Sequence, residues 1–422
     1  MRSFILTGLL VCSLFTHAQN LPSVSEAEVN RVEKTLASDD MEGRKVFTSG
    51  IEKAATFIID EFKKAGLQPL NGSKDFKQSF TMIEPELLEV EATIDGQPVG
   101  KKDLAVLSAA TSLTITPGDH YQKIVIKSAA DFRPVLFKYL DSKENVLVLV
   151  DTSLSKSFAR IATMKLPQFE GFGNRVFILT STDPQQYNIQ FKQKINRKEL
   201  TNLVGILPGT SKPEEYVIFS AHYDHLGIGM PDQNGDSVYN GANDDASGTT
   251  AVILLADYYH RLHNNQRTLI FAAFTAEEIG EFGSSYFSRQ LNPDKIMAMF
   301  NIEMIGTESK WGKNSAYITG YEKSDMGAIL QKNLENTQFT FYPDPYPAQK
   351  LFLRSDNATL AKLGVPAHTI STSKMDSEKF YHKQGDGVET LDLKNMTEII
   401  NAIALSSGSI ISARDTPARI KP

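Results

Sequence analysis

The stretch YVIFSAHYD, residues 216–224, is the starting point for predicting the fold of this chain of 422 residues. Its apolar part has the length and composition of a buried strand, and residues 248–262 beyond it carry apolar side chains at helical spacing. Two more apolar runs follow, TLIFAAF at 268–274 and IMAMFNI at 296–302. Apolar strands that alternate with helices are typical of a parallel sheet with both faces covered. We therefore predict an α/β fold with a mostly parallel sheet and helices on both faces.

The alternation extends in both directions along the chain. We expect further strands at 316–319 and 367–371, and further helices at 27–37, 51–65, 284–291, 325–335 and 393–412. Residues 79–192 differ, because short β-type runs separated by turn residues such as Asp95-Gly96 dominate them. The prediction is thus a discontinuous domain formed by residues 26–72 and 197–414, interrupted by a smaller, mostly β insert.

Residues 1–18 have the pattern of an export signal. Arg2 precedes an apolar run at 4–15, and Ala18 supplies a small residue at the expected cleavage point. The run is shorter than the ~20 apolar residues that a membrane-spanning helix needs. We expect a periplasmic or secreted protein without a membrane span. Because the single cysteine, Cys12, lies in this segment, the mature chain would have no thiol nucleophile, disulfide or thiolate metal site.

The charge distribution argues against one class of partner. The chain has 44 basic and 50 acidic residues, a formal net charge of −6, and the two signs are interspersed. It has neither the basic footprint of a nucleic-acid-binding protein nor a polybasic patch for a membrane surface. We expect no nucleic-acid partner, and any chemistry must come from histidines, carboxylates and hydroxyls.

A histidine and an aspartate stand at the end of the first strand. His222 and Asp224 are two positions apart, so in an extended segment they point to the same side. We expect the Asp224 carboxylate to accept a hydrogen bond from the second ring nitrogen of His222, which would fix its tautomer as a ligand. A surface His–Asp pair is the ordinary alternative for this pattern alone.

Adjacent acids recur where the next elements begin or end. Asp244 and Asp245 lie in GANDDASG, just before the predicted helix at 248–262, where acids also serve as helix-start residues. Glu277 and Glu278 follow the strand at 268–274. Two neighbouring buried carboxylates need a positive partner, and one can bind a metal while the other takes a proton from water. A solvated helix start is again the alternative.

Taken together, the strand ends supply a set of possible metal ligands. The set has two imidazoles and three carboxylates, and open α/β sheets bind their ligands at this edge. One carboxylate bridging two metals would give each metal one histidine and carboxylate oxygens, which suits Zn²⁺, with Mn²⁺ or Co²⁺ as substitutes. The candidate ligands are His222, Asp244, Glu278, Glu303 and His382.

The ordered series HYD, GANDDASG, AEEIG, NIEMIG and YH resembles the co-catalytic zinc aminopeptidases of metallopeptidase family twenty-eight, over roughly 27–72 and 197–414. The resemblance implies two zinc ions per chain, bridged by Asp244, with a cis peptide bond to Asp245. It implies that His222 binds one zinc and His382 the other. It also implies that Glu278 binds one of the two zinc ions and Glu303 the other. It also implies that Glu277 is the general base and that Tyr381 donates to the developing oxyanion.

The chain departs from the family pattern at two places. Glu303 stands where the family more often has aspartate, which could change metal spacing or the pocket for the substrate's amine. Ser355-Asp356-Asn357 stands where many relatives have Ser-Asp-His, and Asp356 is either near the site or a helix N-cap. The insert occupies the position where many relatives carry a protease-associated domain.

The expected activity is that of an exported aminopeptidase acting on peptides as a monomer. A glutaminyl cyclase with a single zinc is one alternative, since such enzymes resemble this family, but the complete ligand set favours two metals. A carboxypeptidase for acidic peptides is another, with Arg354 as the one arginine that keeps it open. A metal-free binding scaffold is disfavoured by the intact ligands and Glu277.

Overall fold

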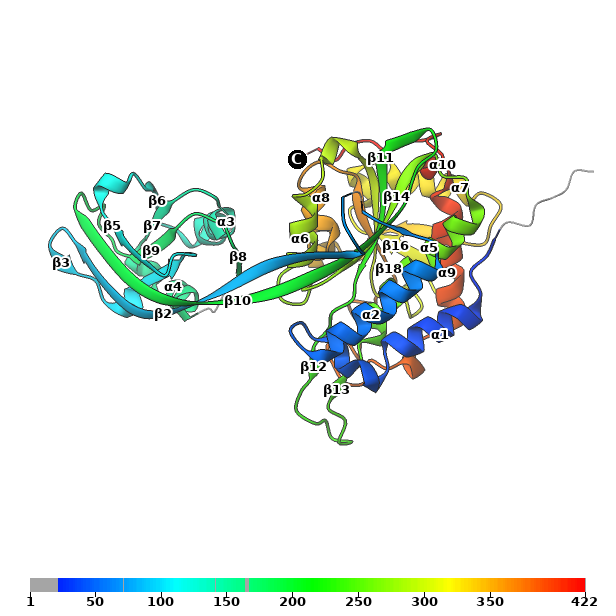
Figure 1. The fold of residues 1–422 in the computed structure, drawn as a ribbon, viewed down its shortest axis with the longest axis horizontal. Helices are drawn as coiled ribbons and strands as arrows, with labels where there is room; N and C mark the ends of the chain where they lie inside the picture. The colour runs from blue at the N-terminus through cyan, green and yellow to red at the C-terminus, as the bar shows by residue number, and fades with distance from the viewer. Residues whose placement is uncertain (1–21, 71, 141, 164–166, 422) are drawn as a thin grey trace, which may run out of the picture.

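The computed structural model describes residues 22–70, 72–140, 142–163 and 167–421. The predicted export signal at 1–18 therefore lies outside the described residues. Two bodies are joined by a ribbon of two long antiparallel strands, β2 (Lys77–Ile94) and β10 (Tyr187–Leu207), as Figure 1 shows. The larger body contains both ends of the described chain, and the smaller body is built within the insert.

The larger body is organised around a sheet with a parallel centre. Its order is β17-β16-β18-β15-β11-β14-β10, and the neighbours from β14 to β18 run parallel. Toward the two edges the pairing becomes antiparallel: β10 runs antiparallel to β14, and β16 runs antiparallel to β18. The mostly parallel α/β prediction is confirmed. The strands are β11 (Lys212–His222), β14 (Arg267–Phe274), β15 (Ile296–Ile302), β16 (Ser315–Ile318), β17 (Thr340–Pro343) and β18 (Ala367–Ser371).

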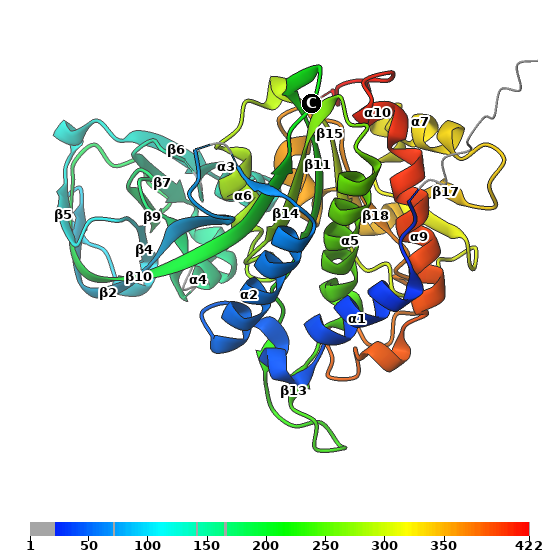
Figure 2. The ribbon, with the colours of Figure 1, turned by 45° about the vertical axis from the view of Figure 1, so that its right-hand side comes forward.

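Helices cover both faces of this sheet, as Figures 1 and 2 show. The larger apolar core lies under α1 (Glu26–Leu36), α2 (Ser49–Lys64), α5 (Ser247–Leu262), α7 (Met326–Asn333) and α9 (Leu393–Ser406). The smaller core lies under α6 (Phe282–Ser288) and α8 (Asn357–Ala361). The helix predicted at 393–412 is divided at Ser407, and its last part is α10 (Gly408–Ile411).

The insert has more helix than its sequence predicts. The strands β4 (Leu104–Leu107), β9 (Arg175–Leu179), β7 (Val146–Val150) and β6 (Gln122–Ile126) form a separate sheet in that order. Alternate side chains of β7 point to opposite faces of this sheet. On one face they pack against α3 (Ala129–Leu140) and α4 (Ser155–Thr163). On the other face they pack against β10 and β5 (Ser112–Ile115). The remaining short strands are β1 (Gln68–Pro69), β3 (Gln97–Pro98), β8 (Gln168–Phe169), β12 (Gly227–Ile228) and β13 (Val238–Tyr239).

A cluster of aromatic rings fastens the insert to the larger body. Phe169 of β8 lies with its ring centroid 5.6 Å from that of Phe282 and 6.3 Å from that of Tyr286 in α6. The Tyr286 ring also stacks on Phe80 at 4.5 Å. We call these four residues the aromatic junction. Ala276 belongs to the same apolar cluster, so the junction reaches the segment that leads to Glu277.

Candidate metal centre

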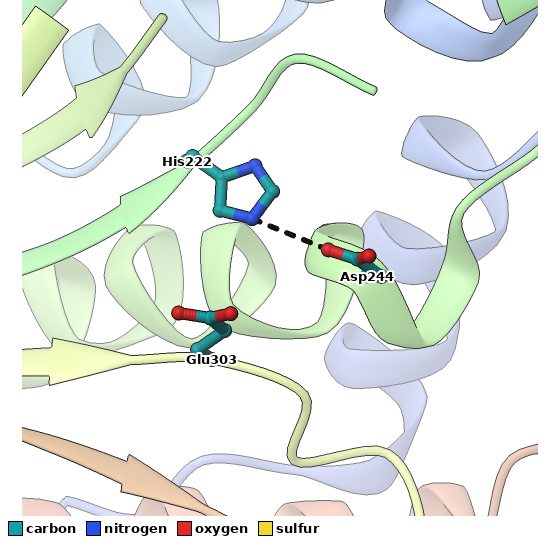
Figure 3. Close-up of side chains that lie close together, drawn as sticks. All are labelled: His222, Asp244 and Glu303. Atoms are coloured by element: carbon teal, nitrogen blue, oxygen red, sulfur yellow. Dashed lines mark ion pairs between the residues drawn. The ribbon is translucent and has the colours of Figure 1, made fainter. Parts of the chain in front are cut away.

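Two buried ligand groups and one partly buried group meet at the carboxyl ends of the parallel strands. His222 ends β11, Glu303 follows β15, and Asp244 lies in the turn before α5. The His222 Nε2 atom is 3.2 Å from Asp244 Oδ1. Figure 3 marks this ion pair with a dashed line. One ligand atom of each residue lies within 4.8 Å of the others, which is close enough for a shared metal ion.

The other oxygen of Asp244 faces a second histidine. Asp244 Oδ2 is 3.2 Å from His382 Nε2, and the same nitrogen is 3.1 Å from Glu278 Oε2. The Asp244 carboxylate thus lies between two imidazoles, with one oxygen toward each. All five predicted ligands are brought together by the fold, and the arrangement has the form needed for a bridging carboxylate.

His225 is a neighbour that the sequence prediction missed. Its Nδ1 atom is 2.7 Å from Glu278 Oε1, and His225, Asp244 and Glu278 form a second group with ligand atoms within 4.8 Å. The buried His225 Nε2 atom has no hydrogen-bond partner among the described residues. The only sequence signal was its position three residues after His222, which does not reveal that the ring turns toward Glu278.

Asp224 makes a different contact from the one expected. The His222 Nδ1 atom lies 3.1 Å from the backbone oxygen of Asp224, whereas the carboxylate oxygen is 3.9 Å away. The carboxylate accepts instead from the backbone amide of Glu277 at 3.1 Å. The chain turns directly after the strand, so the extended geometry that underlies the prediction does not hold at Asp224. The backbone oxygen still fixes the tautomer of His222 by accepting from Nδ1.

The turn that carries Asp244 is held from several sides. The bond between Asp244 and Asp245 is cis, as the family resemblance implied. Asp245 Oδ1 accepts from the backbone amides of Gly248 at 3.1 Å and Met304 at 3.0 Å. Asp386, which follows His382 in the chain, accepts from the backbone amide of Asp244 at 3.0 Å. These bonds tie the turn to the segments that carry Glu303 and His382.

A buried arginine, Arg44, supports the backbone near the ligands His222 and Asp244. No sequence motif predicted this role. Arg44 donates to the backbone oxygens of Tyr223 at 2.9 Å, Asn240 at 2.6 Å and Gly241 at 2.9 Å. Its side chain is fully buried. Because these oxygens flank His222 and precede Asp244, Arg44 fixes the two ligand-bearing segments relative to each other.

Glu277 and Tyr381, predicted as general base and oxyanion donor, each directly precede a predicted ligand in the chain. Glu277 is partly covered just beyond β14, and burial raises the pKa of its carboxyl well above the usual range. Tyr381 is 40% exposed, and its ring stacks on His382 with centroids 3.9 Å apart. Burial of the phenol, followed by the nearby carboxylates, raises the pKa of Tyr381, so its hydroxyl remains a donor at neutral pH.

The electrostatics of the site fit a divalent cation. Burial raises the pKa of Glu303 to about 7 and that of Asp356 to about 8. Burial also opposes ionisation of Glu278, yet hydrogen bonds from His225 and His382 lower its pKa to about 2. The buried Glu303 Oε2 atom has no hydrogen-bond partner in the described part of the chain. A cluster of carboxylates with an unused oxygen needs positive charge, and the nitrogen and oxygen donors match Zn²⁺.

The fold is α/β and the site has residues that could hold metal ions, and the comparisons relate part of the chain to a known family. Residues 202–406 match the model of peptidase family M28. This match agrees with the resemblance to that family that the sequence motifs indicate. The matched segment contains every ligand of the candidate centre.

Curated relatives of known sequence agree with this match. A "Probable zinc metalloprotease" of Leptosphaeria maculans is 30% identical over 112 residues, which are 26% of this chain and 25% of that protein. The chain spans about a quarter of the length of the curated relatives it matches.

Two solved structures show the same fold. BSAP, a zinc aminopeptidase from Bacillus subtilis, has a TM-score of 0.56 and 17% identity, with 94% of this chain and 98% of that chain covered. An aminopeptidase from Aneurinibacillus sp. strain AM-1 has a TM-score of 0.54 and 16% identity, with 94% of this chain and 96% of that chain covered.

Proposed function

We propose that the chain is a zinc aminopeptidase that removes N-terminal residues from peptides at a dinuclear centre. One observation carries the proposal: the two carboxylate oxygens of Asp244 lie 3.2 Å from His222 Nε2 and 3.2 Å from His382 Nε2. A carboxylate in this position can bridge two metal ions, each of which then has its own histidine. The M28 assignment and the zinc aminopeptidase fold support the same conclusion.

The five residues divide into two ligand sets that share Asp244. His222 and Glu303 would complete one set, and His382 and Glu278 the other. When bound, zinc polarises a carbonyl oxygen and brings the pKa of a water molecule down toward ~7. His225 and the backbone oxygen of Asp224 orient the ligands Glu278 and His222 through their hydrogen bonds.

The chain's own residues supply proton transfer and charge stabilisation. Glu277 accepts a proton from the attacking water and delivers it to the leaving amine, a task for which a raised carboxyl pKa is suited. The Tyr381 hydroxyl donates to the carbonyl oxygen as negative charge develops on it. Tyr381 lies beside His382, so this donor is next to the ligand set.

The charge of the site favours a peptide's amino terminus over its carboxyl terminus. Glu277, Glu303 and Asp356 are covered carboxyl groups at or near the centre, and in their ionised form they attract an ammonium group and repel a terminal carboxylate. This supports an aminopeptidase rather than a carboxypeptidase.

We also propose export and a monomeric state. The N-terminal signal pattern supports export to the periplasm or the medium. Among the described residues, no helix combines the length and apolarity that crossing a membrane requires. The aromatic junction reaches the segment before Glu277, so we propose that the insert shapes access to the site.

The test begins with purified mature protein, its zinc content, and a panel of aminoacyl-arylamides with and without chelator. We expect about two zinc ions per chain and arylamine release that chelation abolishes. His222→Ala and His382→Ala should each reduce the zinc content, whereas His260→Ala, on the exposed end of α5, should not. One tightly held zinc, no arylamine release and cyclisation of Gln-initiated peptides would replace the proposal with a cyclase. N-terminal sequencing and light scattering of the secreted fraction test export and monomeric mass.

A further inference from the structure

We propose that the cavity beside Glu303 receives the side chain of the substrate's first residue, and that Arg354 selects an acidic side chain there. This inference rests on the proposed aminopeptidase function and names its substrate class as peptides with N-terminal glutamate or aspartate. The cavity touches the centre directly, since Glu303, Tyr381 and Arg354 all line it. A peptide whose amine and first carbonyl lie at the ligands would therefore place its first side chain in this cavity.

The size of the cavity limits that side chain. Its volume is about 50 Å³, against roughly 10–15 Å³ for a site that holds one water molecule. It thus has room for about four or five non-hydrogen atoms. Aspartate, glutamate and leucine side chains match this size, and indole or phenol rings do not. Size alone leaves acidic and aliphatic residues as candidates.

The polar groups on the cavity wall are mostly committed to other partners. The Tyr317 hydroxyl donates to the backbone oxygen of Ser373 at 3.1 Å. The Thr369 hydroxyl donates to Asn357 Oδ1 at 2.8 Å. These bonds keep two walls of the cavity from offering a donor to a substrate.

Arg354 is different, because its charge is not used. It follows the short helix η9 (Leu351–Leu353), its side chain is exposed, and its guanidinium forms no hydrogen bond or ion pair with any described residue. A guanidinium can bind a carboxylate through two parallel hydrogen bonds. An unpaired guanidinium on a residue that lines a cavity sized for four or five atoms favours an acidic side chain over an aliphatic one of similar size.

The acidic wall of the same cavity does not oppose this assignment. Glu303 lines the cavity as a proposed zinc ligand, and Arg354 is the cationic residue among the lining residues. A glutamate side chain bound in this cavity would pair its carboxylate with Arg354.

The test compares kcat/KM for Glu-, Gln-, Leu- and Lys-arylamides in the wild type, Arg354→Ala and Arg354→Glu. We expect the wild type to prefer Glu over the isosteric Gln, and Arg354→Ala to lower the Glu-to-Gln ratio roughly 10- to 100-fold. Arg354→Glu should shift the preference to Lys. Lys350→Ala removes an exposed cation from the same segment outside the cavity and should leave the ratio unchanged.

Three outcomes would overturn the inference. Equal kcat/KM for Glu and Gln in the wild type would remove the acidic preference. An Arg354→Ala variant with the same Glu-to-Gln ratio as the wild type would remove the role of Arg354. Arylamides lack a terminal carboxylate, so an effect confined to dipeptides would assign Arg354 to the substrate's carboxyl end instead. If no arylamide were cleaved by zinc-loaded protein, the proposed function itself would fail, and the inference with it.

Discussion

The Asp386 carboxylate accepts the backbone amide of Asp244, with Oδ2 lying 3.0 Å from the nitrogen. Its other oxygen accepts the backbone amide of Asn243 at 2.8 Å. Asp386 is buried and lies four residues after His382. The loop that carries one histidine ligand therefore also fixes the turn that carries the carboxylate between both histidines.

Removal of the Asp386 carboxylate should weaken metal binding. Asp386→Ala leaves two buried amides without acceptors, and we expect roughly a 10- to 100-fold loss of zinc affinity and activity. The measurement is zinc retention against a competing chelator, together with arylamide kinetics. Glu389→Ala, an exposed acid on the same loop, is the matched control. Zinc affinity equal to that of the wild type would show that the turn does not need Asp386.

Neutralising the general base should lower turnover without releasing zinc. Glu277→Gln keeps the size of the side chain but cannot accept a proton, so kcat should fall roughly 10²- to 10⁴-fold. Zinc content and KM should stay close to the wild-type values. Steady-state kinetics and metal analysis on the same preparation check both parts. Full activity in this variant would require another base.

Glu33 should make folding stability depend on pH. Its carboxyl is fully buried in α1 and accepts from the Thr250 hydroxyl at 2.8 Å, and burial raises its pKa from 4.5 to about 8. A raised folded-state pKa means that the contribution to stability is complete below pH 4.5 and is lost as the pH rises through 8. Between pH 4.5 and 7 this loss is about 3 kcal/mol.

Glu33→Gln isolates this effect, because glutamine cannot ionise but can still accept from Thr250. We expect the free energy of unfolding of the variant to fall less than that of the wild type over the same pH range. Denaturant unfolding at several pH values, with both proteins in the same metal state, gives the comparison. Parallel pH profiles for the two proteins would contradict the prediction.

The aromatic junction should be required for a fixed attachment of the insert. Phe169→Ala removes a buried ring that contacts Phe282 and Tyr286, and such changes cost about 3 kcal/mol. We expect a lower melting temperature and faster proteolysis of the β2–β10 ribbon. Leu88→Ala, at a 56% exposed position on β2, serves as the control. Unchanged proteolysis would show that the ribbon alone holds the insert in place.

The sequence was most informative where chemistry follows directly after a strand. β11, β14 and β15 each contain a mostly apolar, buried run, and His222, Glu278 and Glu303 come at or just beyond the ends of these strands. A parallel sheet brings such ends to one edge, so the ligands could be found without knowing any distance.

Contacts that depend on the path of the backbone could not be predicted in this way. His225 reaches Glu278, and Asp224 turns its backbone oxygen toward His222, because the chain bends after β11. The helix α3 contains Pro134, a residue that usually argues against a helix interior, which explains why this helix was not predicted.

The ribbon that carries the insert also makes it separable. Lys77 on β2 lies opposite Leu203 on β10, so the chain leaves the larger body and returns to it on adjacent strands. A tight hairpin turn can join two antiparallel strands at any such pair. Evolution can therefore add, exchange or delete everything beyond that point as a single cassette, while the sheet that presents His222 and Glu303 keeps its connectivity.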